Sequence, residues 1–193
     1  MSVVIVNYNA GNVQSVTYAL NRLGVDPVLS DDPSVIQSAD KVIFPGVGEA
    51  STAMNFLRQK GLTDLIKSLK QPVFGVCLGL QLMCKHSEEN NTDCLGIFDI
   101  EVKKFEPKLK VPQMGWNTLT EMKGNLFEQL GAEAYVYFVH SYYAELSEYT
   151  TAVTDYINPF SAALQKDNFY ALQAHPEKSG KVGEQILKNF LAL

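Results

Sequence analysis

The chain has 193 residues, of which 46% are hydrophobic and 19% charged, so it suits one compact domain with a full core and not a disordered chain. The formal net charge of −5 argues against a general nucleic-acid-binding protein, which needs basic surface against phosphate. No apolar run reaches the length of about 18 residues that a membrane-spanning helix needs.

Cysteine usage points to a reducing compartment. The chain contains only Cys77, Cys84 and Cys94, and its first segment, MSVVIVNYNAGN, lacks the basic region of a signal peptide. We therefore expect free thiols and a cytoplasmic location. Cys84 and His86 are too few ligands for a metal site, so neither a metal nor a cofactor is expected.

The first half of the chain alternates strands and helices. Asn9, Gly11 and Asn12 mark the first turn, and Gly24 ends the first helix. This β-α-β-α order predicts a parallel sheet with helices on both faces. The expected strands are 3–6, 28–29, 41–44 and 73–76, and the expected helices are 13–23, a short one beginning near Pro33, 50–59 and 62–69.

The second half predicts shorter, partly antiparallel strands and an amphipathic terminal helix. The expected strands are 96–105, 135–144, 152–156, 162–165 and 170–173, and the helix is 182–191. No repeat, linker or low-complexity tract interrupts the chain. The sequence therefore predicts an α/β fold of one domain, residues 1–193, with a mixed, mostly parallel central sheet flanked by helices.

One cysteine stands where a reactive thiol would. In Gly75-Val76-Cys77-Leu78-Gly79, a buried strand leads directly into Cys77, and a helix begins after it. This is the form of a nucleophile elbow, in which the flanking glycines let strand and helix approach closely. Unpaired N–H groups at the helix start favour the thiolate, and the Leu78 N–H points where an oxyanion would form. A buried structural cysteine fits the pattern equally well, and for Cys84 and Cys94 it fits better.

A second group of residues, Gln173-Ala174-His175-Pro176-Glu177, follows the last predicted strand. Pro176 is expected to hold His175 in an extended conformation and to exclude helix there. In extended chain His175 and Glu177 point to the same side, so the carboxylate can orient the imidazole. A nucleophilic thiol needs such an oriented base. Alone, a surface loop explains these residues better, but together with the elbow they predict a Cys-His-Glu site.

A third stretch, Pro45-Gly46-Val47-Gly48, closes a strand and can turn backbone N–H groups toward an anion. With this stretch upstream, the cysteine elbow next and His175-Pro176-Glu177 last, the chain resembles the class I, or triad-type, glutamine amidotransferases. Within that family it is similar to the branch that supplies ammonia for histidine biosynthesis. The resemblance spans the whole chain and also rests on the stretches 8–12, 112–117 and 139–142.

The resemblance implies a cysteine-dependent glutaminase. Cys77 would be the nucleophile, His175 the acid–base group and Glu177 its orienter, and Leu78, Val47 and Gly48 would supply the oxyanion site. Residues that would hold glutamine are Gly46, Gln81, Glu89, His140, Ser141 and Tyr142. Glu89 could attract the α-ammonium group, although Glu88-Glu89-Asn90-Asn91 also has the composition of a solvated loop.

The resemblance also implies a partner, a (β/α)₈ cyclase with which the chain forms a heterodimer. It implies binding to neither nucleic acid nor membrane. A dry passage between the two proteins would protect ammonia from protonation. Trp116, the only tryptophan, is expected at the interface, with a core position as the alternative. The implied interface residues are Asn12, Met114, Trp116, Asn117, Tyr137 and Lys178.

The chain departs from the family pattern away from the proposed triad. Asn7 and Asn9 stand where Asp and Gly are more common, Gln113 replaces a His, and Ala174 replaces a Phe. Three other functions remain open at this stage. They are a glutaminase that serves another synthase, for example in surface-sugar amination, a cysteine hydrolase of peptides or small amides, and a non-catalytic binding subunit of the same fold.

Overall fold

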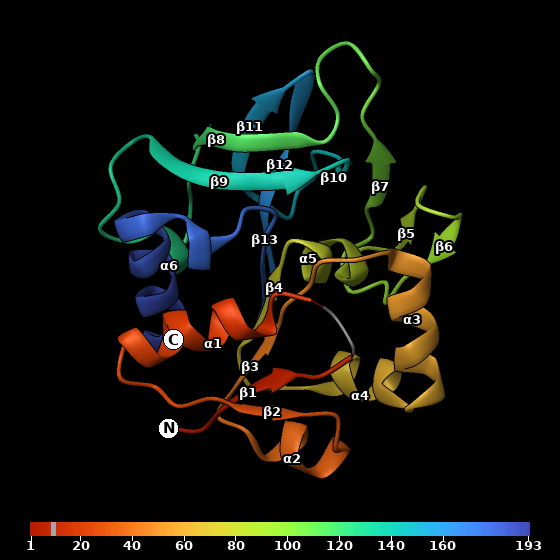
Figure 1. The fold of residues 1–193 in the computed structure, drawn as a ribbon, viewed down its shortest axis with the longest axis vertical. Coiled ribbons are helices and arrows are strands. Elements are labelled where there is room, and N and C mark those ends of the chain that lie inside the picture. The colour runs from red at the N-terminus through yellow and green to blue at the C-terminus, as the bar shows by residue number, and fades with distance from the viewer. Residues whose placement is uncertain (9–10) are drawn as a thin grey trace.

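A mixed central sheet organises the molecule (Figure 1). The computed structural model describes residues 1–8 and 11–193. The parallel half of the sheet runs in the order β2 (Val28–Ser30), β1 (Val3–Val6), β3 (Lys41–Phe44), β4 (Val73–Val76) and β13 (Phe169–Leu172). Beyond it lie β12 (Asn158–Lys166), β10 (Tyr142–Ala144), β7 (Glu101–Lys104), β5 (His86–Ser87) and β6 (Thr92–Asp93), and β11 (Thr150–Tyr156) pairs with β12.

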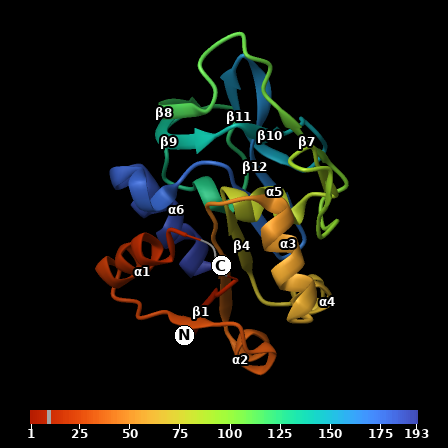
Figure 2. The ribbon, with the colours of Figure 1, turned by 45° about the vertical axis from the view of Figure 1, so that its right-hand side comes forward.

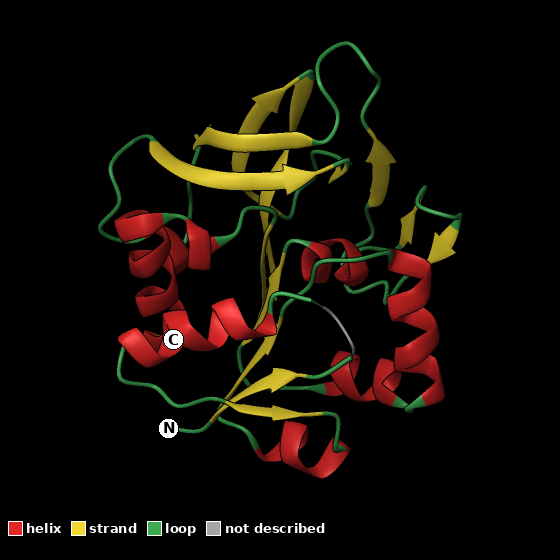
Figure 3. Ribbon diagram, in the orientation of Figure 1, coloured by secondary structure: helices red, strands yellow, loops and turns green. Residues whose placement is uncertain are grey.

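Helices cover both faces of the parallel half (Figures 2 and 3). The strands alternate between two cores: Val3 and Ile5 face one cluster, whereas Val4 and Val6 face the other. The first cluster contains α1 (Val13–Arg22) and α6 (Gly180–Ala192), and the second contains α2 (Pro33–Ser38), α3 (Ala50–Gln59), α4 (Leu62–Ser68) and α5 (Leu78–Met83). Of the helices in the described residues, none has the length and apolar character to cross a membrane.

A separate hairpin packs against the first cluster. It pairs β8 (Gln113–Leu119) with β9 (Ala134–His140) in antiparallel register, and η1 (Asn125–Phe127) lies in its connection. Val136 and Phe138 of β9 are fully buried. In Figure 3 the hairpin crosses the upper end of the central sheet, the end at which β4 gives way to α5. The chain therefore has a second layer over the carboxyl ends of its parallel strands, where sites of α/β proteins form.

The fold class and the order of elements in the first half are confirmed. The turn predicted at Asn9 lies outside the described residues. The terminal helix is longer than expected, Gly180–Ala192. Two expected strands are too long, and β5, β6 and β8 are not anticipated. In the stretch 96–105 only Glu101–Lys104 is strand, because residues 95–98 donate backbone hydrogen bonds to the carbonyl oxygens at the end of α5. The stretch 135–144 breaks at Ser141, where the chain leaves the hairpin for the central sheet.

Candidate active site

Cys77 lies on a strained turn between β4 and α5. Its φ of 52° and ψ of −106° fall in a region that side chains rarely adopt. The flanking glycines allow this turn. A Cβ on Gly79 would lie 1.9 Å from the carbonyl oxygen of Phe44, and one on Gly75 would lie 2.9 Å from the carbonyl carbon of Gly79. The close approach expected of an elbow is therefore present, and the turn holds Cys77 at the end of its strand.

The sheet brings His175 to the same edge. Strands β4 and β13 are parallel neighbours, so their carboxyl ends coincide. The backbone N–H of Cys77 donates to the carbonyl oxygen of Leu172 at 2.8 Å. Three residues beyond Leu172, the backbone N–H of His175 donates to the carbonyl oxygen of Tyr137 on β9 at 2.9 Å. Backbone contacts from the central sheet and the hairpin thus fix the cysteine and the histidine beside each other.

Glu177 holds the His175 ring. Nδ1 of His175 lies 2.7 Å from Oε1 of Glu177, and both side chains are fully buried. Burial opposes a charged ring, but attraction from the Cys77 sulfur and the contact with Glu177 outweigh it and raise the pKa of His175 to about 10. Nε2 of His175 and Oε2 of Glu177 are buried without a hydrogen-bond partner among the described residues. The ring is therefore anchored through Nδ1, and Nε2 is left available for chemistry.

The expectation that Pro176 excludes helix is wrong. His175 itself is extended, with φ −99° and ψ 94°, but Pro176 begins the 3₁₀ turn η2 (Pro176–Lys178). Proline is tolerated there because the first residue of a helical turn needs no backbone N–H donor. The turn, rather than an extended chain, folds Glu177 back onto His175.

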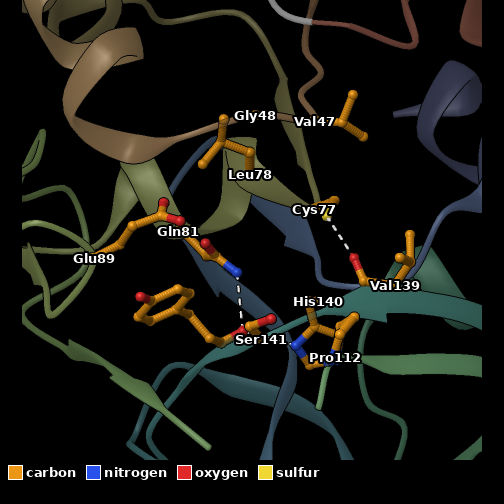
Figure 4. A pocket seen from close by; sticks show the side chains of 11 residues that line it. Val47, Gly48, Cys77, Leu78, Gln81, Glu89, Pro112, Val139, His140 and Ser141 are labelled. Carbon is orange, nitrogen blue, oxygen red and sulfur yellow. Dashed lines mark hydrogen bonds between the residues drawn. The ribbon is translucent and has the colours of Figure 1, made fainter.

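A cavity of about 290 Å³ opens in front of Cys77 (Figure 4). Figure 4 shows the side chains of Gln81 and Glu89 on one side of this cavity and those of Pro112 and His140 on another. Twelve residues were predicted to act in catalysis, in the oxyanion site or in substrate binding, and nine of them line this cavity. The other three are Gly46, His175 and Glu177. The cavity is lined by Val47, Gly48, Cys77, Leu78, Gln81, Glu89, Pro112, Val139, His140, Ser141 and Tyr142.

Glu89 lies in the turn between β5 and β6, whose other residues are exposed as expected, but its own side chain lines the cavity. Its Oε2 accepts a hydrogen bond from the backbone N–H of Ala50, the first residue of α3, at 2.7 Å. Partial burial raises the pKa of Glu89, and the Ala50 hydrogen bond opposes that rise. An ionised carboxylate held in this way can receive an ammonium group in the cavity.

His140 lines the cavity as an uncharged side chain. Its Nδ1 lies 2.7 Å from the carbonyl oxygen of Tyr142, and its Nε2 lies 2.9 Å from the side-chain amide of Gln113. Burial lowers the pKa of His140 to about 4, the hydrogen bond to Tyr142 opposes this, and the nearby His175 adds to it. Gln113, which departs from the family's usual His, thus pairs with a ring that carries no charge at neutral pH.

The predicted oxyanion site is closed in this conformation. The backbone N–H of Leu78 donates to the carbonyl oxygen of Gly46 at 3.2 Å, and the carbonyl oxygen of Val47 accepts from the N–H of Gly11 at 3.2 Å. The hydroxyl of Tyr8, which is buried, donates to the carbonyl oxygen of Pro45. Local sequence assigns no role to Tyr8, although it begins one of the stretches that carry the resemblance. Three hydrogen bonds therefore hold the loop that was expected to offer N–H groups.

The predicted interface residues divide into two sets. Met114 and Trp116 are 60% and 57% exposed, and Trp116 meets Tyr137 edge-on across the hairpin, with ring centroids 6.1 Å apart. Trp116 is therefore not a core residue. Asn117 lies on the other face of β8, where its amide donates to the carbonyl oxygen of Asp155 at 3.1 Å.

Asn12 and Lys178 lie beside the histidine instead. The Asn12 amide donates to Oε1 of Glu177 and lies 3.4 Å from Nδ1 of His175, so it touches the proposed triad. Lys178 is exposed at the end of η2, one residue after Glu177. The position of Asn12 could not be read from the local sequence, because the contact joins residues about 165 positions apart.

The sequence motifs assign no role to Gln173, a buried residue near the Cys77 sulfur. Its side chain is fully buried, and its Nε2 lies 3.6 Å from the sulfur of Cys77. Gln173 precedes His175 by two residues, and this spacing was the available signal, since extended chain puts such residues on one side.

Comparison with known proteins identifies the family. The family Glutamine amidotransferase class-I matches residues 4–193. The chain is 62% identical to the imidazole glycerol phosphate synthase subunit HisH of Bacteroides thetaiotaomicron and 48% identical to that of Escherichia coli, in each case over the whole of both chains. Among solved structures, PurLQS from Thermotoga maritima shares the fold, with a TM-score of 0.72 and 15% identity over 99% of this chain and 97% of its own. The chain is therefore an enzyme of the class I glutamine amidotransferase family.

Proposed function

We propose that the chain is the glutaminase subunit of an imidazole glycerol phosphate synthase. It hydrolyses glutamine to glutamate and ammonia and passes the ammonia to a (β/α)₈ cyclase subunit. That protein forms imidazole glycerol phosphate and AICAR in histidine biosynthesis. The reaction is supported by one observation above all: Cys77, His175 and Glu177 come together at the end of two parallel strands, beside a cavity of amino-acid size. The identity of the synthase is supported by the full-length match to the HisH subunits.

The reaction follows from the positions of these groups. The Cys77 sulfur attacks the side-chain amide carbon of glutamine, and the thiol proton passes to Nε2 of His175, the ring nitrogen without a partner in the part of the chain that is described. His175 then gives this proton to the departing nitrogen, ammonia leaves, and a thioester remains on Cys77. Water, deprotonated by His175, attacks the thioester, and glutamate leaves as the thiol is restored.

The cavity residues account for recognition of glutamine. The carboxylate of Glu89 faces the cavity and is placed to attract the α-ammonium group. Ser141 and Tyr142 also line the cavity, and their backbone N–H groups would bind the α-carboxylate. The Leu78 N–H and an N–H of the loop 46–48 would hold the oxyanion once the contact between Leu78 and Gly46 opens.

The exposed side of the hairpin suits the cyclase partner. Met114, Trp116, Tyr135 and Tyr137 lie on one side of β8 and β9, and three of them are more than half exposed. A large apolar and aromatic patch of this kind is typical of protein–protein interfaces. Because the same hairpin contacts His175 and Cys77 through its backbone, a partner bound here would lie close to the site that releases ammonia.

The test combines the chain with the cyclase of the same organism. We expect the pair, but not Cys77→Ala with the cyclase, to make imidazole glycerol phosphate from glutamine. Both pairs should make it from ammonia, since the cyclase chemistry is separate. The chain should also restore growth without histidine to a strain that lacks its own glutaminase subunit. If the chain hydrolyses glutamine but neither stimulates the cyclase nor restores growth, it serves another synthase.

A further inference from the structure

We propose that Gln173 is a further catalytic residue, whose side-chain N–H donates a hydrogen bond to the Cys77 thiolate. This inference rests on the glutaminase function proposed above and adds a fourth side chain to its site. Nε2 of Gln173 lies 3.6 Å from Sγ of Cys77, within hydrogen-bonding distance for sulfur. Gln173 is fully buried and Cys77 is 5% exposed, so little water competes for this contact.

The direction of the Gln173 amide is set by a chain of hydrogen bonds. Nε2 of Gln81 donates to the backbone carbonyl oxygen of Tyr142 at 3.0 Å and to Oε1 of Gln173 at 3.1 Å. A carbonyl oxygen can only accept, so Gln81 must present its NH₂ group to Tyr142 and Gln173. The oxygen of Gln173 therefore faces Gln81, and its NH₂ group faces the sulfur.

This arrangement favours the charged form of the sulfur. The thiol can donate its proton toward the carbonyl oxygen of Val139, 3.9 Å away, but a thiolate can only accept. An N–H donor fixed beside the sulfur stabilises the thiolate more than the thiol, because hydrogen bonds to charged groups are the stronger ones. Gln173 and His175 thus act on the same atom, the first as a fixed donor and the second as the proton carrier.

The same chain of hydrogen bonds couples the sulfur to the substrate cavity. Gln81 and Tyr142 line the cavity, whereas Gln173 lies behind the sulfur. Glutamine that contacts Gln81 would therefore affect the hydrogen bonds that connect Gln81, through Gln173, to the Cys77 sulfur. A purely structural Gln173 would hold Gln81 in place and leave the sulfur unaffected, so the two roles predict different results.

The test is the rate of alkylation of Cys77 by iodoacetamide, followed as a function of pH in the intact chain. Peptide mass spectrometry separates Cys77 from the partly buried Cys94. We expect Gln173→Leu to slow alkylation of Cys77 at pH 7 by about tenfold, the effect of losing one hydrogen bond to a charged group. The midpoint of the pH profile should move upward. Gln173→Glu keeps the shape and, when ionised, offers only acceptors and a negative charge beside the sulfur, so it should slow alkylation further at a pH where this carboxyl group is charged.

Two controls complete the experiment. Gln59→Leu makes the same change at an exposed position at the end of α3 and should leave the alkylation profile unchanged. Gln81→Leu removes the contact with Tyr142 and should raise KM for glutamine more than it slows alkylation. None of these variants alters the titratable groups already around the sulfur, which are His175, Glu177, His140, Glu89 and Tyr8, and only Gln173→Glu adds one.

The outcome separates this proposal from the glutaminase function, because iodoacetamide needs no glutamine. If Gln173→Leu and Gln173→Glu both fold, as judged by thermal unfolding, and both alkylate at the rate and pH midpoint of the parent chain, Gln173 does not act on the sulfur. If alkylation slows as expected but neither the parent chain nor any variant hydrolyses glutamine with the cyclase, the contact stands and the proposed function fails.

Discussion

The backbone N–H of Leu78 donates to the carbonyl oxygen of Gly46 at 3.2 Å, so a proposed oxyanion donor is already occupied by the loop that should assist it. The loop presents a carbonyl where an N–H is needed. Losing one oxyanion donor typically costs about 10²–10³ in rate. In this conformation the proposed site therefore lacks the Leu78 donor that would stabilise the tetrahedral intermediate.

We expect the isolated chain to hydrolyse glutamine at least about 10²-fold more slowly than the complex with cyclase and acceptor ligand. A crystal structure of the active complex should show a peptide between Gly46 and Gly48 turned so that an N–H faces the cavity. Glycine at both ends makes this rotation sterically easy. Equal turnover with and without the cyclase, or an unchanged peptide in the active complex, would contradict this mechanism.

Tyr8→Phe provides a direct test of whether the closed loop at residues 46–48 limits turnover. The Tyr8 hydroxyl anchors the loop through the carbonyl oxygen of Pro45, and its removal leaves the ring packed on Phe44. Turnover by the isolated variant should rise several-fold above that of the parent chain, while turnover by the complex changes little. A lower rate in the isolated variant would show that the anchor supports the active loop instead.

His175→Ala is expected to lower kcat of the complex by about 10³–10⁴-fold, and Glu177→Ala by no more than that. In the proposed roles, His175 moves protons at the reacting atoms, whereas Glu177 meets the ring only at Nδ1, on its far side. Steady-state glutamine hydrolysis with a fixed excess of cyclase measures both. A correctly folded Glu177→Ala complex with the lower kcat of the two would reverse these role assignments.

Trp116→Ala should weaken binding of the cyclase by about 30-fold or more, as expected for an aromatic residue at the centre of an interface. Since the Trp116 side chain is 57% exposed, thermal unfolding of the free chain should be nearly unchanged. Titration calorimetry gives the first quantity and a melting curve the second. Leu29→Ala, which removes a similarly exposed side chain from edge strand β2 at the opposite end of the molecule, is the matched control (Figure 1).

His140 should make the fold sensitive to acid. Its pKa is lowered from 6.5 to about 4 in the folded chain, so between these values the unfolded state binds about one more proton than the folded state. The free energy of unfolding therefore falls as the pH is lowered through this window, by about 1.4 kcal/mol per pH unit from this group at most. Urea unfolding at several pH values should show a steeper decline for the parent chain than for His140→Asn. Parallel declines would mean that His140 titrates normally in the folded state.

The parts of the site that depend on neighbouring residues could be predicted from the sequence. Gly75 and Gly79 flank Cys77 at the spacing an elbow requires, and that spacing is local. The strand β8 could not be predicted in this way, because Gly115 and Asn117 interrupt its apolar pattern, and the strand forms by pairing with β9 some twenty residues later in the chain. Tertiary pairing here outweighs local propensity.

The contacts that complete the site are long-range, and no local pattern encodes them. Resemblance assigns Asn12 to the interface, yet its side chain donates to Glu177. Gln113 is a departure from the family pattern, yet its partner, His140, is set by the register of β8 against β9. These positions could be inferred only after the sheet had brought separate segments together.

The hairpin contacts the proposed triad through main-chain atoms. The carbonyl oxygen of Tyr137 accepts from the N–H of His175, and the carbonyl oxygen of Val139 faces the sulfur of Cys77. These contacts do not depend on which side chains the strand carries on its outward face. The outward side chains can therefore be exchanged to fit the surface of another synthase, while the backbone positions of Cys77 and His175 are kept.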